Sequence, residues 1–346
     1  MKLEAWQRFK RIALSPSPYG KREVAVALIV DSPWIPGFTG ISHFDYFTFP
    51  DAWMKANLYM EDRFPSVIFI PGFWVEYGMA TEPSAFGCPI SWKEDSPPSI
   101  HPILHDISEV SRLRTPRPRE DGLMPLVLHL YQHVEKELKG TGHQIKMVAA
   151  RGPLALAAHL RGFTEFLIDL KLNPSETKRL LEITTETVIR WLQVQKDVLS
   201  EVEGILVLDD IVGFLSPEDY LEFAHPYLKA IFSSFEGMVK VYHNDSPITH
   251  LLGSLVEAGF HVLNFSHTMD IGEVSQRIGD RVTLMGNVPP LDLLVRGTPE
   301  EVKSFALDCI KKTQEGRSLL LSAGGGVSPG TSPENIDALV QALAAE

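Results

Sequence analysis

The chain has 346 residues, of which 44% are hydrophobic and 22% charged, and its formal net charge is −12. This composition is typical of a globular protein with enough apolar residues for a large core. The Lys and Arg residues are dispersed along the chain rather than clustered. Because no basic stripe is present to neutralise phosphates, the sequence argues against nucleic-acid binding.

The two cysteines, Cys88 and Cys309, provide neither a disulfide framework nor a Cys-x-x-Cys metal pair. This usage fits a reducing cytoplasm, which is the predicted location. Residues 1–11 mix charged and apolar side chains, so they are neither a signal peptide nor a membrane span. No later segment is an uninterrupted apolar run of membrane length, and we expect no membrane association.

Residues 3–14 predict an amphipathic helix, because apolar side chains recur every three residues from Leu3 to Ile12. The stretch 35–50 is rich in Gly, Pro and aromatic residues and predicts a loop with too much apolar surface to remain in water. Such a loop either forms a lid or cleft wall or, more commonly, packs permanently on the body. We expect residues 1–60 to form an extension of helix, strand and aromatic loop, packed on a barrel formed by residues 61–346.

Short aliphatic and β-branched runs predict eight buried strands. These runs are residues 23–30, 66–71, 146–150, 205–208, 239–243, 261–265, 282–286 and 318–321. Because helical patterns separate most of them, the sequence predicts a single (β/α)8 TIM-like barrel. The competing fold is a doubly wound sheet, which a strand count alone does not exclude. However, no Gly-x-Gly-x-x-Gly follows the first strand, and the glycine run 324–326 lies at the wrong end of the chain for that motif.

Polar side chains follow most of these strands. In a barrel all strands end at one mouth, where catalytic residues gather, so these side chains are expected to share a pocket. The candidates are Glu82 (or Glu76), Arg151, Asp209, Asp210, Tyr242, His243, Asn244, Asp245, His267 and Asn287.

The two histidines in this group, His243 and His267, each end a buried strand, which favours acid–base chemistry or metal binding. The other candidates also have ordinary structural explanations. Asp209 and Asp210 are in a position to bond backbone amides, and Asn287 to stabilise a turn. Histidines elsewhere in the chain lie in helical or loop patterns, where a packed or exposed histidine is far commoner than a ligand.

Several motifs resemble the uroporphyrinogen decarboxylase superfamily, over most of the chain from about residue 60 onward. The most specific are residues 285–290 (MGNVPP) and 321–336 (LSAGGGVSPGTSPENI), supported by 150–153 (ARGP) and 215–220 (LSPEDY). The resemblance implies a TIM-like barrel, in agreement with the strand pattern.

The decarboxylase branch of that family carries an N-terminal Met-Arg-Gln-Ala-Gly-Arg-Tyr segment whose arginines hold substrate carboxylates, and this chain lacks it. The branch's catalytic aspartate, in a Phe-Ser-Asp-Ile pattern, aligns with residues 64–67, which puts Ser66 in its place, and its Gly-His-Gly-Ile histidine falls near Gly325. An enzyme that binds a polyanionic porphyrinogen would lose its cationic anchors with these changes.

A second branch contains methyltransferases that act with corrinoid proteins, such as the methylcobalamin:coenzyme M type. These enzymes bind Zn²⁺ through a His-x-Cys pair and a distant Cys. His243 matches the histidine, whereas Asp245 and Gly325 occupy the two cysteine positions. The resemblance therefore implies either a non-standard Zn²⁺ site, formed by His243 and Asp245 with Glu82 or His267, or a metal-free site in which the first two serve as acid–base or binding groups.

We therefore expect a methyltransferase-like enzyme. It would move a methyl group between a small O-, N- or S-methyl compound or acceptor and a corrinoid (methylcobalamin) carried by a partner protein. The expected catalytic residues are His243, Asp245, Asp209 and Tyr242. The expected substrate-binding residues are Asp210, Asn244, His267, Asn287, Arg151 and Glu82.

Two alternatives remain open at this point. One is a uroporphyrinogen decarboxylase-type lyase of tetrapyrrole metabolism, and the other is a binding barrel without catalysis. The polar cluster at the strand ends argues against the second, because a purely structural protein has no reason to bury it.

Overall fold

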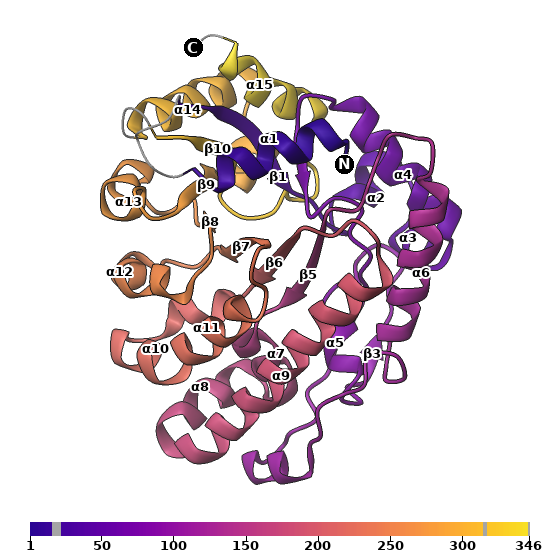
Figure 1. The fold of residues 1–346 in the computed structure, drawn as a ribbon, viewed down its shortest axis with the longest axis vertical. Coiled ribbons are helices and arrows are strands. Elements are labelled where there is room, and N and C mark those ends of the chain that lie inside the picture. Colours follow the sequence, from indigo (N-terminus) through magenta and orange to yellow (C-terminus); the bar gives the residue numbers. More distant parts are fainter. Residues whose placement is uncertain (16–21, 314–316, 345–346) are drawn as a thin grey trace.

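The computed structural model describes residues 1–15, 22–313 and 317–344. A parallel eight-stranded sheet curls into a nearly closed barrel, with helices around it (Figure 1). Its strands are β1 (Val24–Ile29), β2 (Ile68–Ile70), β5 (Met147–Arg151), β6 (Gly204–Leu208), β7 (Val239–Asn244), β8 (Val262–Phe265), β9 (Thr283–Val288) and β10 (Leu319–Ala323). Their spatial order is β2-β1-β10-β9-β8-β7-β6-β5, so β2 and β5 are the two ends of the sheet.

A separate two-stranded hairpin consists of β3 (Ile90–Ser91) and β4 (Ser99–Ile100). The α-helices are α1 (Leu3–Ala13), α2 (Ile35–Thr39), α3 (His43–Thr48), α4 (Pro50–Arg63), α5 (Thr81–Ser84), α6 (Met124–Glu137), α7 (Pro153–Arg161), α8 (Phe163–Leu172), α9 (Pro174–Val198), α10 (Pro217–Phe223), α11 (His225–Ser233), α12 (Leu252–Leu255), α13 (Ile271–Ile278), α14 (Pro299–Lys312) and α15 (Pro333–Leu343). Short 3₁₀ or π turns are η1 (Ile107–Arg112), η2 (Asp210–Phe214), η3 (Thr249–Leu251), η4 (Val256–Ala258) and η5 (Pro290–Val295).

The predicted fold class is confirmed. Each predicted run overlaps one strand of the barrel, with its ends shifted by at most two residues. Neighbouring strands are parallel, and their register sets His243 beside Leu208 of β6 and Asn264 of β8. The carboxyl ends of all these strands therefore open at one mouth, as the sequence argument required.

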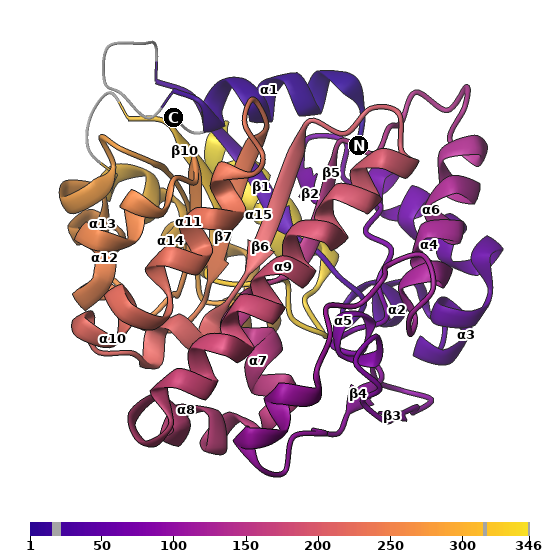
Figure 2. The ribbon, with the colours of Figure 1, turned by 60° about the horizontal axis from the view of Figure 1, so that its bottom comes forward.

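Helix α1 closes the amino-terminal end of the barrel (Figure 2). Its side chains Trp6, Phe9 and Ile12 are buried in the same apolar cluster as the inward-facing strand residues. The Oγ1 of Thr283 at the start of β9 also donates a hydrogen bond to the Ile12 carbonyl, at 3.0 Å. Because α1 covers this end of the barrel, we expect a site at the opposite end, near the β3–β4 hairpin.

The predicted extension, residues 1–60, is built into the barrel. β1 pairs with both β2 and β10, so the predicted boundary near residue 60 falls between two neighbouring strands of one sheet. The aromatic stretch 35–50 forms α2 and α3 instead of a loop, because Pro36 lies in the first turn of α2 and the Ser42 hydroxyl caps α3. The rings of Trp34 and Phe38 stack 4.5 Å apart against the body, as in the more common of the two predicted arrangements.

None of the helices in the described ranges combines the length and the apolar character that a membrane crossing requires.

Candidate functional site

Side-chain alternation along the strands decides which residues reach the mouth. In β7, Val239 and Val241 belong to the interior cluster, so His243 and Asp245 continue on the inward face. In β5, Met147 and Ala149 are interior, and Arg151 follows on the same face. The inward positions at the strand ends are therefore polar, while those deeper in the barrel are apolar.

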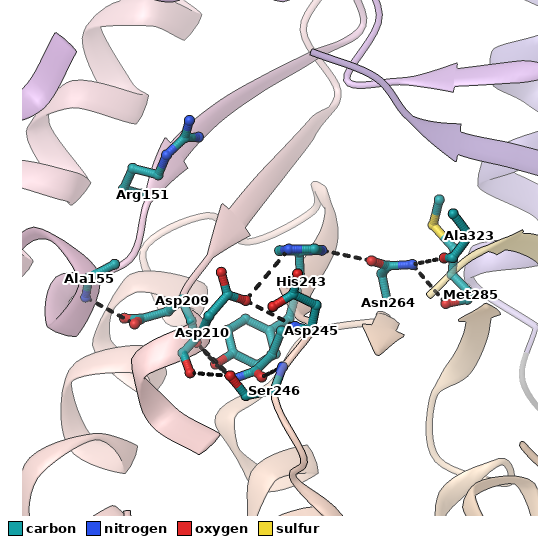
Figure 3. A network of polar contacts seen from close by, with 12 residues as sticks. Arg151, Ala155, Asp209, Asp210, His243, Asp245, Ser246, Asn264, Met285 and Ala323 are labelled. Atoms are coloured by element: carbon teal, nitrogen blue, oxygen red, sulfur yellow. Dashed lines mark hydrogen bonds and ion pairs between the residues drawn. The ribbon is translucent and has the colours of Figure 1, made fainter. Parts of the chain in front are cut away.

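Three of these side chains converge on one point (Figure 3). Asp210, His243 and Asp245 each offer a ligand atom within 4.8 Å of the other two. The His243 Nε2 lies 3.5 Å from Asp210 Oδ1, and the Asp245 amide donates to the same oxygen at 2.9 Å. Tetrahedral Zn²⁺ ligands at about 2.1 Å from the ion lie about 3.4 Å from one another, so this N···O separation fits a Zn²⁺ site.

Asn264 fixes the tautomer of His243. The amide Nδ2 of Asn264 donates to the carbonyls of Met285 and Ala323, at 3.0 and 3.1 Å. Both donors of that amide are thereby used, so its Oδ1, 2.7 Å from His243 Nδ1, is the acceptor and Nδ1 carries the proton. In its neutral form the imidazole therefore directs the lone pair of Nε2 toward Asp210, as a metal ligand or a proton acceptor requires.

The two carboxylates of the cluster are electrostatically unfavourable without a cation. Partial burial raises the pKa of Asp245, the neighbouring Asp210 carboxylate raises it further, and His243 opposes the shift. Like charges this close are relieved by a proton or by a bound cation. A divalent ion would bind where His243 Nε2 and both carboxylates point, and the donor set therefore fits Zn²⁺.

The cluster lines a cavity of about 250 Å³. Its residues are Ile29, Asp31, Met79, Arg151, Ala155, His159, Leu208, Asp210, Ile211, His243, Asp245 and Gly326. A second cavity of about 390 Å³, bordered by the β3–β4 hairpin, shares Asp31, Met79, Arg151 and His159 with the first. A depression of about 450 Å³ beside α1 and α6 lies at the closed end of the barrel, away from these residues.

Arg151 lines both mouth cavities, but its guanidinium is already paired. Its Nη2 lies 3.1 Å from Glu76 Oε2, and its Nε contacts the Met79 sulfur. The predicted residue Glu82 is buried and accepts the Arg151 backbone amide through Oε1 at 2.9 Å. Burial raises the pKa of Glu82, with the Arg151 charge opposing it. Glu82 therefore supports the site from behind and does not line the 250 Å³ cavity.

Three predicted residues at the ends of β6 and β7 point away from the cavity. The carboxylate of Asp209 accepts the amides of Leu154 and Ala155, at 2.9 and 3.0 Å, at the start of α7. Burial raises the pKa of Asp209, and these hydrogen bonds oppose the shift. Tyr242 and Asn244 both donate to the Asp209 carbonyl, at 3.0 and 2.8 Å. Asp209 therefore ties the end of β6 to α7, as the capping explanation allowed, and Tyr242 and Asn244 tie β7 to the end of β6.

Asn287 and His267 also lie apart from the cluster. Asn287 Nδ2 donates to the carbonyls of Ser266 and Met269, which ties the end of β9 to the loop after β8. The half-buried His267 has its backbone against Gly324 and is not part of either mouth cavity. Neither residue therefore lies within reach of His243 Nε2 as a ligand in this arrangement.

The predictions missed Asp31, His159 and Asn264. A signal existed for Asp31, because it directly follows the first strand in step with the inward-facing Ala27 and Ile29. Asn264 was equally readable, as an isolated amide inside an apolar strand. His159 gave no signal, since it lies on α7 and reaches the cavity only because this helix borders the mouth.

The family model for uroporphyrinogen decarboxylase (URO-D) matches residues 37–345. The chain belongs to this family. The uroporphyrinogen decarboxylase of Synechococcus sp. (strain CC9605) is 28% identical over 262 residues, which cover 72% of this chain and 71% of that protein. That of Coxiella burnetii (strain Dugway 5J108-111) is 26% identical over 311 residues, or 85% and 81% of the two chains.

Among solved structures, a methyltransferase from Methanosarcina mazei superposes with a TM-score of 0.80 over 96% of each chain, at 21% identity. At this level of identity, the match establishes the shared barrel fold.

The family resemblance singled out Gly325 and Ser66, and these two residues lie at opposite ends of the barrel strands. Gly325 lies beside the cluster, since a Cβ placed on it would lie 3.4 Å from Asp245 Oδ2. Ser66, by contrast, is exposed just before β2, at the amino end of that strand. The prediction that Ser66 replaces a catalytic aspartate is therefore wrong, because catalytic side chains of a barrel lie at the opposite ends of the strands.

Proposed function

We propose that this protein is a methyltransferase that moves a methyl group between a small methylated compound and a corrinoid on a partner protein. We further propose that it uses a Zn²⁺ ion held by His243, Asp245 and Asp210. The observation that carries the proposal is the convergence of an oriented imidazole Nε2 and two carboxylates in one cavity at the mouth. The Methanosarcina mazei methyltransferase, which shares the fold, supports the reaction class.

The ligand set favours activation of a methylated oxygen or nitrogen over activation of a thiol. A set of one nitrogen and two carboxylates donates less charge to Zn²⁺ than thiolates do. Bound there, Zn²⁺ would supply Lewis acidity to the heteroatom that carries the methyl group. His243 and the two carboxylates would hold the ion, and Asn264 orients the imidazole.

Decarboxylation of a porphyrinogen is the second candidate, because the relatives cited above are decarboxylases. A polyanionic substrate requires free cationic anchors. Arg151 is the single Lys or Arg among the residues that line the two described mouth cavities, and Glu76 already pairs with it. The surrounding carboxylates would repel further anions. The electrostatics of the mouth therefore favour the methyltransferase.

The test is zinc content and methyl transfer in matched variants. We expect about one Zn²⁺ per chain after zinc reconstitution, and loss of the ion and of transfer from methylcobalamin or a methylated donor in His243→Ala. The control is His129→Ala, an exposed histidine on α6. Metal is measured by mass spectrometry and methyl transfer by the cobalamin absorbance spectrum.

Three outcomes would overturn the proposal. One is ready conversion of uroporphyrinogen to coproporphyrinogen, which would identify the decarboxylase. Another is zinc binding that His243→Ala leaves unchanged. The third is a zinc-loaded protein with no transfer to or from any corrinoid or methylated compound, which would favour a binding barrel.

A further inference from the structure

Asp31 is the carboxyl group of the mouth for which the site described above has no use. It follows β1 on the inward face, after Ala27 and Ile29 of the interior cluster. It lines both the 250 Å³ and the 390 Å³ cavities. Gly326 bridges to Ile29 of the same strand, and a Cβ placed on Gly325 would lie 3.4 Å from Asp245 Oδ2. Asp31 and the His243 cluster therefore border the same cavity on either side of this glycine segment.

The carboxylate of Asp31 has no partner from another residue within the described ranges. The hydrogen bond it accepts comes from its own backbone amide. Its carbonyl, rather than its side chain, accepts the amides of Trp34 and Ile35. Arg151 is the neighbouring cation, but its Nη2 lies on Glu76, and its guanidinium carbon lies 5.0 Å from the Trp74 ring. The cavity thus contains the Asp31 carboxyl group, whose neighbouring cation, Arg151, is already paired with Glu76.

We infer that Asp31 is the specificity residue of a substrate subsite for a small N-methylated ammonium ion that retains an N–H group, such as a protonated tertiary amine. This inference rests on the proposed function, because it names the class of methyl compound that the site would take. The substrate would donate its N–H to Asp31 and expose its methyl groups to the cavity that the His243 cluster lines. Its protonated nitrogen has no lone pair for Zn²⁺, so Asp31 rather than the ion would bind it, and its positive charge would make the amine a leaving group.

The net charge of the groups that border the cavity favours a singly charged cation as the ligand. A divalent ion in the cluster would neutralise Asp210 and Asp245, and Glu76 neutralises Arg151. His159, which also lines the cavity, is neutral near pH 7, because burial, reinforced by the Arg151 charge, lowers its pKa to about 4. One negative charge, that of Asp31, then remains. Without the divalent ion the excess of negative charge is larger, so the preference for a cation has the same sign.

The walls of the cavity suit methyl groups. The apolar lining residues Ile29, Ala155, Leu208 and Ile211 come from β1, α7, β6 and η2. A methylated amine places its charge on a carboxylate and its methyl groups on such aliphatic surface, whereas a bare ammonium ion would leave its remaining N–H groups without partners against that surface. A quaternary ion would lack the N–H that Asp31 accepts. The subsite therefore selects by charge, by shape and by one hydrogen bond.

The test is the binding of trimethylammonium chloride to the full chain, with and without zinc. Binding is measured by saturation-transfer NMR. Neutral tert-butyl alcohol, of similar size, and tetramethylammonium, without N–H, are the comparison probes. We expect trimethylammonium to bind at least tenfold more tightly than tert-butyl alcohol, and several-fold more tightly than tetramethylammonium. Asp31→Asn should remove the preference for trimethylammonium over the alcohol. Asp280→Asn, an exposed acid on the surface, is the matched control and should retain the preference.

A pH series sharpens the result. Burial raises the pKa of Asp31 to about 7, the Glu76 charge adds to the shift, and Arg151 opposes it. Trimethylammonium stays protonated near neutral pH, as a lysine ammonium does, so its affinity should rise as Asp31 ionises between about pH 6 and pH 8. The Asp31→Asn variant should show no such rise.

Equal binding of the cation and the alcohol by the wild-type chain, or unchanged binding in a folded Asp31→Asn variant, would overturn the inference. Circular dichroism establishes that the variant folds. The binding measurement uses no corrinoid and no methyl transfer. A protein that fails every transfer assay and still binds the cation through Asp31 would refute the reaction and leave the subsite intact.

Discussion

The two faces of β6 and β7 offer a direct comparison, because polar residues alternate between them. On the inward face, Asp210, His243 and Asp245 come within 4.8 Å of one another and line a cavity. On the outward face, Tyr242 and Asn244 donate to the carbonyl of Asp209 and have no access to that cavity.

The difference shows that a polar residue at a strand end is not by itself evidence of a site. Six side-chain positions in two short stretches, 209–210 and 242–245, are polar, yet every second one bonds to the backbone of a neighbouring element. An outward polar group is satisfied by backbone partners, and its loss should weaken folding. An inward group keeps a free ligand atom, and its loss should weaken binding. Each prediction below tests one side of this division.

The largest effect is expected for Asn264→Ala, which leaves His243 in place but removes the acceptor of its Nδ1 proton. Loss of such an outer-shell partner typically lowers metal affinity about 10- to 100-fold. Zinc affinity is measured by competition with a chromophoric chelator, and the tautomer by ¹⁵N NMR of the imidazole. A variant with wild-type zinc affinity and an unchanged Nδ1–H tautomer would show that Asn264 does not position the ring.

A smaller effect, and on folding instead of binding, is expected for Asp209→Ala. The substitution removes the acceptor of two amides in the first turn of α7, where Gly152 has no side chain to replace it. The expected loss is about 1–2 kcal/mol of unfolding free energy, measured by urea denaturation. Zinc affinity should change by less than about twofold, because the carboxylate does not line the cavity. A loss of zinc without a loss of stability would place Asp209 with the functional residues.

The smallest effect is expected for Tyr242→Phe, which keeps the buried ring and removes one hydrogen bond to the Asp209 carbonyl. Asn244 still donates to the same carbonyl, so the expected cost is about 0.5–1.5 kcal/mol of unfolding free energy. Methyl-transfer activity should remain that of the wild type. An activity loss of tenfold or more in a stable variant would instead support the original prediction of a catalytic tyrosine.

The sequence was sufficient for the barrel, because eight aliphatic runs separated by helical patterns leave few other arrangements. It was also sufficient to place His243 and Asp245 at the mouth, because they continue the inward alternation of Val239 and Val241. The same alternation, applied consistently, would have assigned Tyr242 and Asn244 to the helix-facing side.

Other features could not be read from the sequence. That Asp210 reaches His243 depends on the register between β6 and β7, and that His159 reaches the cavity depends on the position of α7 over the mouth. Both are products of packing between segments distant in sequence. Whether Glu82 or Glu76 would pair with Arg151 was equally undetermined, since both follow the same strand.

Asn264 also has a consequence for how the site is assembled. One amide joins the imidazole of β7 to carbonyls on β9 and β10, so four strands must be aligned before Nε2 is aimed correctly. The orientation of this imidazole therefore depends on the correct alignment of four of the eight strands. A chain in which those strands had slipped or frayed would misalign Nε2 while most of its secondary structure survived.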